Sequence, residues 1–257
     1  MAVVTLTTDF GTRDPYVGIM KGVLATRAPA ATLIDVTHGV PPRDVLAGAL
    51  VLRHAVPYFP AGAIHLAVVD PGVGGPRRAL CVETTHGFLV GPDNGLLSLA
   101  APAGDILRIV HLTEQRFFLS PPSRTFHGRD VFAPVAAALA TGTRPSALGV
   151  EVAGLERLDV PAVRGEGTTL HGQVLYVDHF GNLVTNVPAA VVEGRDVVVH
   201  FRDTAVHGLS TSYAAGVPGE AVAVIGSWGL LEIAVRDGDA RVTLGASIGD
   251  PLRIEMR

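Results

Sequence analysis

Cysteine is almost absent from this chain, and so are long apolar runs. The single cysteine among 257 residues, Cys81, excludes an internal disulfide framework, and no CxxC or Cys/His cluster offers a zinc site. The uncharged run 131–143 has only 13 residues and contains Pro134, so it is too short to span a bilayer. The N-terminal residues lack the charged and apolar pattern of a signal peptide. We therefore expect a cytoplasmic protein with no membrane partner.

An excess of positive charge is also missing. The chain has 20 Lys and Arg residues against 24 Asp and Glu residues, which gives a net charge of −4 with neutral histidine. This balance lacks the basic footprint that nucleic acids and anionic membranes attract, so we expect no nucleic-acid partner. Apolar residues make up 48% of the chain and charged residues 17%, a composition typical of a globular protein with a buried core.

Strand and helix signals alternate through the first 150 residues. This alternation predicts an α/β N-terminal domain over residues 1–152, with a mostly parallel sheet covered on both faces. The strands expected there are 3–8, 32–36, 64–69, 78–83, 88–90 and 107–111, and the helices expected are 14–27, 44–58 and 128–141.

The pattern changes near Val150. Residues 153–167 contain Pro161 and the tripeptide Gly165-Glu166-Gly167, and they show no sustained hydrophobic periodicity, so we expect a linker there. After residue 167 the strand signals dominate and turn signals separate them, which predicts a smaller all-β, barrel-like C-terminal domain over 168–257. Its expected strands are 171–178, 183–187, 197–201, 221–225, 231–235 and 251–256.

Polar side chains follow the first predicted strand. Asp9 comes directly after it, and Asp14 and Tyr16 lie just beyond. Ligands of open α/β sheets bind beyond the carboxyl ends of the strands, where a carboxylate can accept hydrogen bonds from both ribose hydroxyls. Helix N-capping is the alternative role for both aspartates.

The third predicted strand leads directly to Asp70 and then to a loop with three Gly and two Pro that ends in Arg77 and Arg78. Such a loop permits close backbone approach, but it lacks the spacing of a phosphate-binding loop. A rigid turn with a surface arginine is the alternative. His127 precedes Gly128 at the start of a predicted helix, where it either faces a ligand crevice or has a structural role.

Two dense polar turns, 178–186 and 226–232, interrupt apolar strands of the second domain. The only tryptophan lies between two glycines in the second turn. A loop tryptophan indicates a ring that stacks on a ligand or faces a cation, and a ring that caps the barrel is the alternative. The candidate binding residues of these turns are Asp178, Asn182, Ser227, Trp228 and Glu232.

Seven motifs, taken in order, resemble the S-adenosyl-L-methionine (SAM) hydrolase family, the SAM hydroxide adenosyltransferases, which are related to fluorinases and chlorinases. They are TTDFG at 7–11, YVGIMKG at 16–22, VVDPGVG at 68–74, PDNG at 92–95, FHGRDVFAPVAA at 126–137, DHFGNLVTN at 178–186 and GSWGLLEIAV at 226–235. The resemblance implies an α/β domain, a β-barrel domain and a homotrimer. It also implies that SAM lies between the N-terminal domain of one subunit and the C-terminal domain of its neighbour.

The resemblance further implies a catalytic Asp–Arg–His set, which falls on Asp70, Arg77 and His127, with Arg78 as the adjacent alternative to Arg77. Halogenating relatives lack this set, so its presence favours water over halide as the nucleophile. Trp228 stands where those relatives carry an arginine. The implied substrate-binding residues are Asp9, Asp14, Tyr16, Asp178, Asn182, Ser227, Trp228 and Glu232.

The implied reaction is attack of water or hydroxide at C5′ of SAM, which yields adenosine and L-methionine without a cofactor or a metal. In this interpretation Asp70 and His127 orient the water and accept its proton, and Arg77 stabilises charge. Two alternatives remain open. One is a metal-dependent nucleoside hydrolase that uses Asp9, Asp14 and Asp70, and the other is a non-catalytic sensor that binds SAM or a nucleoside.

Overall fold

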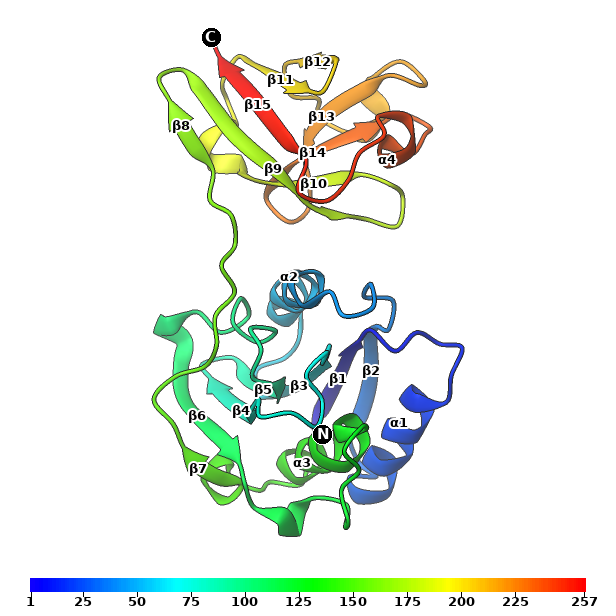
Figure 1. The fold of residues 1–257 in the computed structure, drawn as a ribbon, viewed down its shortest axis with the longest axis vertical. Coiled ribbons are helices and arrows are strands. Elements are labelled where there is room, and N and C mark those ends of the chain that lie inside the picture. The colour runs from blue at the N-terminus through cyan, green and yellow to red at the C-terminus, as the bar shows by residue number, and fades with distance from the viewer. The chain divides into compact units, whose positions relative to one another are not determined.

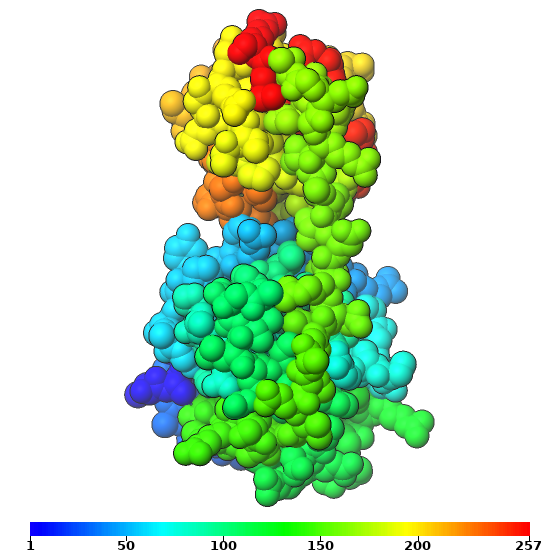
Figure 2. Space-filling view, turned by 90° about the vertical axis from the view of Figure 1, so that its left-hand side faces the viewer, coloured from blue at the N-terminus to red at the C-terminus, as the bar shows by residue number.

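The computed structural model describes residues 1–257, and the chain divides into two compact units, 1–158 and 159–257 (Figure 1). Each unit contains one sheet and its own hydrophobic core. Within the first unit, the cyan and green parts of the chain form one continuous surface (Figure 2). No helix has both the length and the apolar character needed to cross a membrane.

The sheet of the first unit has seven strands in the order β2-β1-β3-β5-β4-β6-β7. They are β1 (Val3–Thr8), β2 (Thr32–Thr37), β3 (Ala63–Val68), β4 (Ala79–Thr84), β5 (Gly87–Pro92), β6 (Ile106–Leu112) and β7 (Gly149–Glu151). Strands β2, β1, β3 and β5 are paired in parallel, whereas β4, β6 and β7 are added antiparallel. The prediction of a mostly parallel sheet is therefore wrong. The sheet is mixed, because the hairpin of β4 and β5 reverses the chain and two further strands extend that edge.

Three α-helices belong to the first unit: α1 (Tyr16–Arg27), α2 (Val45–Ala55) and α3 (Ala133–Ala140). Helices α1 and α3 pack together over the core that contains Val4 and Leu6 of β1, and α2 lies on the other side of the sheet (Figure 1). Strand β3 is buried along its whole length, as a strand covered on both faces should be. Helix α1 begins two residues later than predicted, after Pro15, and no side chain caps it.

The second unit is an eight-stranded antiparallel sheet in the order β12-β11-β15-β9-β10-β14-β13, with β8 also paired to β9. Its strands are β8 (Arg164–Glu166), β9 (Thr169–Val177), β10 (Leu183–Pro188), β11 (Val197–Phe201), β12 (Thr204–His207), β13 (Ala221–Ile225), β14 (Leu230–Val235) and β15 (Pro251–Met256). A short helix, α4, covers Ala240–Thr243. Ser210, which follows β12, bridges Val224 of β13, so the two ends of the sheet approach each other and the sheet is nearly a barrel.

The shortest elements of the chain are helical turns and connecting strands, most of which no sequence pattern indicated. Strand β8 lies inside the stretch where we expected a linker. A π-helical turn over Gly128–Phe132 precedes α3, where a continuous α-helix was expected. The 3-10 turns are Val56–Tyr58, Ala103–Asp105, Gln115–Phe117, Pro145–Ala147, Ala189–Val191 and Tyr213–Ala215.

Candidate active site

Arg77 joins Asp70 and His127 in one hydrogen-bonded group, which we call the Asp–Arg–His cluster. Its Nε lies 3.0 Å from Oδ1 and 3.1 Å from Oδ2 of Asp70, and Nη2 also donates to Oδ2. The same Nη2 lies 2.8 Å from Nδ1 of His127. The side chains of Asp70 and Arg77 are 4% and 11% exposed. One buried guanidinium therefore orients both a carboxylate and an imidazole.

Gly74 lets the loop after β3 approach the segment that carries His127. Its φ is +76°, and a Cβ atom there would lie 2.2 Å from the carbonyl oxygen of Arg124. Neither the conformation nor the space accepts another residue. Because Arg124 precedes His127 by only three positions, this backbone contact helps to bring Arg77 within reach of the imidazole.

Arg78 has a different role from its neighbour. Its Nε lies 2.7 Å from Oδ2 of Asp93, and its Nη2 donates to the carbonyl of Gly154 at 2.9 Å. Asp93 belongs to the PDNG turn and is buried. Arg78 therefore ties that turn to the chain that follows β7. Of the two adjacent arginines, the structure places Arg77 in the Asp–Arg–His cluster.

The hydrogen bond from Arg77 determines the tautomer of His127. A guanidinium can only donate, so Nδ1 of His127 must accept, and the proton of the neutral ring is then on Nε2. Burial lowers the pKa of His127 below its ordinary value of 6.5, and the charge of Arg77 lowers it further. Asp70 and Asp130 act in the opposite direction without reversing the shift. The imidazole is therefore neutral at pH 7.

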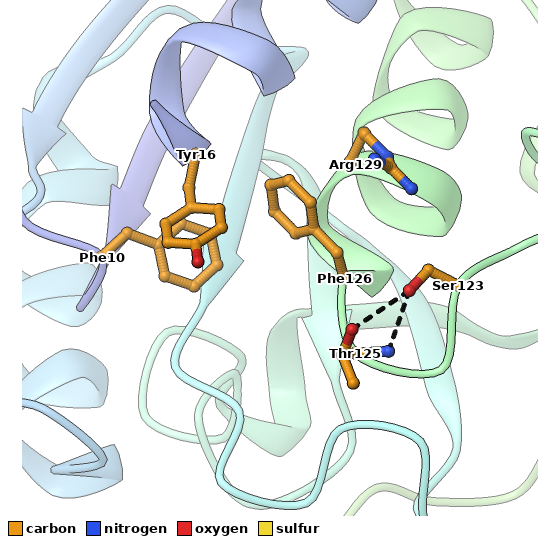
Figure 3. A pocket seen from close by; sticks show the side chains of 6 residues that line it. All are labelled: Phe10, Tyr16, Ser123, Thr125, Phe126 and Arg129. Atoms are coloured by element: carbon orange, nitrogen blue, oxygen red, sulfur yellow. Dashed lines mark hydrogen bonds between the residues drawn. The ribbon is translucent and has the colours of Figure 1, made fainter. Parts of the chain in front are cut away.

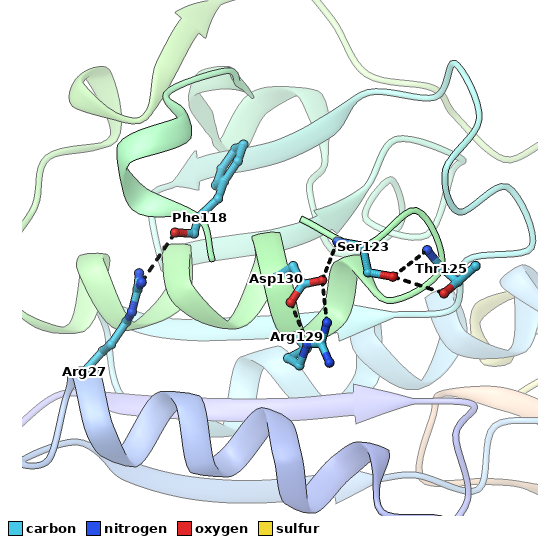
Figure 4. Close-up of polar contacts among 6 residues, drawn as sticks. All are labelled: Arg27, Phe118, Ser123, Thr125, Arg129 and Asp130. Carbon is cyan, nitrogen blue, oxygen red and sulfur yellow. Dashed lines mark hydrogen bonds and ion pairs between the residues drawn. The ribbon is translucent and has the colours of Figure 1, made fainter. Parts of the chain in front are cut away.

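Buried Asp130 fixes the segment that carries Phe126 and His127. Its Oδ2 accepts from the backbone N of Ser123 at 2.7 Å, and its Oδ1 lies 2.5 Å from Nε of Arg129 (Figure 4). Burial acts to raise the pKa of Asp130, but the hydrogen bonds from Arg129 and Ser123 outweigh it, so the pKa lies below its ordinary value. Asp130 is thus a charged anchor for the site; it lies within the motif at 126–137 but was not among the predicted site residues.

Of the cavities near the Asp–Arg–His cluster, two adjoin each other on the side of Phe10 and Phe126. The smaller, of about 40 Å³, is lined by both Asp70 and His127 and by Phe10, Thr125 and Phe126, among others. This volume holds a water molecule but is far below that of a site for a whole small-molecule ligand. We call it the water cavity.

The larger cavity, of about 400 Å³, has three aromatic rings and three polar side chains in its wall (Figure 3). The rings pack edge to face, with centroid separations between 5.2 and 5.9 Å. It shares three residues with the water cavity, so the two spaces adjoin. We call it the aromatic pocket, and it is lined by Phe10, Tyr16, Ser123, Thr125, Phe126 and Arg129.

The three polar candidates near β1 have different surroundings. Asp9 follows the strand, and its Oδ2 accepts from the backbone N of Arg43 at 2.8 Å. Asp14 is exposed before α1, and Tyr16 is the first residue of that helix and lines the aromatic pocket. Neither aspartate caps the helix. No group of three or more His, Cys, Asp or Glu side chains is arranged to hold a metal, Asp9, Asp14 and Asp70 included.

In the second unit, Asp178 organises the first polar turn. Its Oδ1 accepts from the backbone N atoms of Phe180 and Asn182 at 2.9 and 2.8 Å, and its Oδ2 accepts from Nδ2 of Asn182 at 2.8 Å. Asn182 lines a cavity of about 440 Å³ together with Phe180 and Tyr213, among others. Neither ring was predicted, although Phe180 is an aromatic residue in an otherwise polar turn and is 72% exposed.

The second polar turn surrounds a buried carboxylate. Glu232 on β14 accepts a hydrogen bond from the hydroxyl of Tyr213 at 2.7 Å, and burial raises the pKa of Glu232, as does the nearby charge of Asp178. Trp228 stacks on Tyr176 of β9 with a centroid separation of 5.3 Å, which is the packing expected of a ring that covers the barrel. Ser227 is exposed beside it.

Both parts of the chain match known sequences. Residues 4–149 match the model of the SAM hydroxide adenosyltransferase N-terminal domain, and residues 172–253 match that of the C-terminal domain. The chain belongs to the SAM hydroxide adenosyltransferase family. Among its relatives, an (R)-S-adenosyl-L-methionine hydrolase of Salinispora tropica is 46% identical over 98% of this chain and 97% of that protein.

Other relatives agree with this assignment. An (R)-S-adenosyl-L-methionine hydrolase of Thermus thermophilus is 42% identical over 99% of this chain and all of that protein. A fluorinase of Nocardia brasiliensis is more distant, at 27% identity over 90% of this chain and 89% of that protein. The crystal structure of an uncharacterized conserved protein from Thermotoga maritima is similar with a TM-score of 0.90, at 35% identity over 98% of this chain and 99% of that one.

Proposed function

We propose that this protein hydrolyses SAM, in the (R) form that its relatives' name specifies, to adenosine and L-methionine. The observation that supports this most strongly is the bridge that Arg77 makes between Asp70 and His127 at the edge of a water-sized cavity. A nearby carboxylate and a neutral imidazole are what a water nucleophile needs to be oriented and deprotonated.

In the proposed reaction, the oxygen of a water molecule forms a bond to C5′ while the bond from C5′ to sulfur breaks. The electron pair of that bond goes to sulfur, which converts the sulfonium into the neutral thioether of methionine. The proton of the water passes to Asp70 and then to solvent. A neutral leaving group departs easily, so most of the catalysis comes from holding the water in line with the breaking bond.

A preformed hydroxide is not required. Lowering the pKa of water from about 15.7 to about 7 needs roughly 12 kcal/mol, at about 1.36 kcal/mol per pKa unit. One arginine at about 4 Å supplies only about 4 kcal/mol at an effective dielectric constant of about 20. We therefore propose that neutral water attacks and that its proton leaves late in the step.

The hydrogen bonds divide the roles within the Asp–Arg–His cluster. Nδ1 of His127 is occupied by Arg77, so its Nε2–H is the group that can donate to the water oxygen. Asp70 is the proton acceptor, because its carboxylate keeps free lone pairs beside Arg77. The sequence-based interpretation gave both water orientation and proton acceptance to Asp70 and His127, and we propose this narrower division of the two roles.

The charges of the cluster suit a cationic substrate. Arg77 and Asp70 offset each other, and His127 is neutral at pH 7, so the cluster as a whole does not repel a sulfonium ion. We further propose that Asp9 binds the ribose hydroxyls. Contacts to the adenine and to the methionyl end, apart from its carboxylate, are assigned to Asp178, Asn182, Ser227 and Glu232 on the strength of the family resemblance.

We also propose a homotrimer in which each site takes its N-terminal residues from one protomer and its C-terminal residues from a neighbour. The support is the family resemblance together with the division of the candidate residues between the two units. The absence of a cofactor and the cytoplasmic location stay predictions.

Product analysis tests the proposed function. Purified protein incubated with SAM should release adenosine and methionine in equal amounts, and EDTA should not reduce the rate. Release of free adenine with loss of activity in EDTA would favour the metal-dependent nucleoside hydrolase instead. Tight binding of SAM without turnover would favour the sensor.

A further inference from the structure

The carboxylate of the substrate's methionyl group needs a cationic partner. This argument rests on the proposed function. The candidates in the second unit do not supply one, because Asp178 and Glu232 are acids and Trp228 is an indole packed on Tyr176. Arg77 is already committed to Asp70 and His127.

Arg129 is the cation in the wall of the aromatic pocket. Its Nε and Nη2 lie 2.5 and 2.9 Å from the two carboxylate oxygens of buried Asp130, which holds the guanidinium in one orientation (Figure 4). Its central carbon also lies 5.3 Å from the ring centroid of Phe126. These two contacts hold the guanidinium in place and so pre-organise it for a ligand.

The remaining nitrogen of Arg129 is free to bind a ligand. No hydrogen-bond partner within the chain occupies Nη1, and the side chain is 36% exposed. Ser123 and Thr125 stand on the same side of Phe126 as the guanidinium, and their hydroxyls lie 3.1 Å apart (Figure 3). One of these hydroxyls donates to the other, so this end of the aromatic pocket offers two N–H donors and one hydroxyl donor, a donor set that suits a carboxylate.

The other end of the pocket has the opposite character. Phe10 and Tyr16 lie across Phe126 from the polar side chains (Figure 3). Aromatic faces attract an onium group and cover an aliphatic chain. A ligand that is cationic and apolar at one end and anionic at the other, as the methionyl sulfonium is, fits this arrangement.

We propose that Arg129 binds the α-carboxylate of the substrate's methionyl group, with the methionyl chain held in the aromatic pocket. The water cavity adjoins this pocket through Phe10, Thr125 and Phe126. With C5′ placed where the two spaces adjoin, the water in one and the leaving group in the other lie on opposite sides of that carbon, as an in-line displacement requires.

A pair of substrates tests this assignment: SAM, and decarboxylated SAM, which keeps the sulfonium but lacks the carboxylate. Arg129→Met should lower kcat/KM for SAM by about 10- to 100-fold, the range expected when a charged hydrogen bond is lost. The same variant should leave kcat/KM for decarboxylated SAM unchanged. An equal loss for both substrates, or no loss for SAM, would overturn the proposal.

Arg116→Met is a matched control. Arg116 also lies over a phenylalanine, 5.0 Å from the ring of Phe117, and also pairs with an acid, Glu114 at 3.6 Å, but it is 67% exposed and outside the aromatic pocket. Arg116→Met should leave kcat/KM unchanged for both SAM and decarboxylated SAM. A loss of SAM turnover in this control equal to that in Arg129→Met would count against the proposal.

Asp130 is buried, so removing its partner can destabilise the fold. Thermal unfolding of each variant measures any such loss of stability. If Arg129→Met does not fold, Arg129→Lys is used in its place for the comparison of the two substrates. The lysine variant should again lose activity selectively on SAM, and an equal loss on both substrates would overturn the proposal. If the wild type fails to hydrolyse SAM, the proposed function falls. If the wild type hydrolyses SAM and the variant keeps the wild-type ratio of kcat/KM for SAM to that for decarboxylated SAM, only the proposed role of Arg129 is refuted.

Discussion

A single guanidinium determines the arrangement of the proposed chemistry. Arg77 presents a planar set of donors that reaches a carboxylate on one edge and an imidazole nitrogen on the other, which the point charge of a lysine cannot do in a fixed geometry. The residue types were predictable from the sequence motifs. The family resemblance favoured Arg77 over Arg78, but residue patterns alone could not decide between them, because adjacent side chains point in different directions and only the local backbone decides which one turns inward.

Substitutions should separate residues that act on the water from those that bind the substrate. Asp70→Asn should lower kcat by about 10²- to 10⁴-fold with little change in SAM affinity, because it removes the proton acceptor.

Asp9→Ala should mainly raise KM, because a ribose contact is made equally in the ground state and the transition state. Steady-state kinetics and calorimetric binding check both. The division of roles is wrong if the two variants lose affinity equally.

The acid limb of the activity profile should reflect His127. Its pKa is lowered in the folded protein, so the neutral form persists to a pH below 6.5. Protonation at Nδ1 removes the acceptor for Arg77 and adds a positive charge beside the sulfonium. We therefore expect the midpoint of the acid limb of kcat/KM to lie below pH 6.5.

His127→Asn is the matched variant for this pH profile. Asparagine keeps a carbonyl acceptor for Arg77 but has no group that titrates. Its residual activity should lose the part of the acid limb that His127 causes. A midpoint above pH 6.5 in the wild type, or the same midpoint in both proteins, would contradict the account.

At the level of elements, long strands were predictable and short ones were not. The six strands predicted in the second unit are all present, since each is an apolar or alternating run bounded by turn residues. Strands β7, β8 and β12 have only three or four residues, too few for a period to be visible. The direction of β6 and β7 also could not be read locally, because it depends on where the chain returns to the sheet.

Gly74 tests whether the loop after β3 sets the geometry of the cluster. Gly74→Ala should lower kcat about 10-fold or more, because a Cβ atom 2.2 Å from a backbone carbonyl forces the loop away from His127. Gly62→Ala is the control, since Gly62 has a similar φ of +82° but nothing within 4 Å of its Cβ position.

Both glycine variants should lose roughly 1–2 kcal/mol of stability from the left-handed conformation, measured by denaturant unfolding. Only Gly74→Ala should also lose catalytic activity, whereas Gly62→Ala should keep it. Full activity in Gly74→Ala would show that the backbone contact with Arg124 does not position the cluster.

At the level of the whole molecule, the change of character near Val150 agrees with a chain of two sheet-rich units. The predicted limits of the domains and linker, at 152 and 168, stay predictions beside the observed division after Leu158. The identity of neighbouring subunits could not be inferred from residue patterns alone, because assembly joins surfaces that are remote in sequence. The homotrimer is therefore predicted from the family resemblance alone.

Mixing two inactive variants tests whether sites are shared between protomers. Asp70→Ala carries its defect in the first unit and Asn182→Ala in the second. When the two are unfolded and reassembled together, some shared sites would combine two intact halves, so activity should partly return. Each variant refolded alone serves as the control. No recovery, in mixed trimers verified by mass, would show that every site lies within one chain.

The most direct test of the central claim is hydrolysis of SAM in ¹⁸O-labelled water, followed by mass spectrometry of both products. Attack of water at C5′ predicts that adenosine carries one ¹⁸O, at its 5′-hydroxyl, and that methionine carries none. The label should appear equally in the presence of EDTA and of chloride. Unlabelled adenosine, free adenine, or a 5′-halogenated nucleoside as the main product would contradict the account.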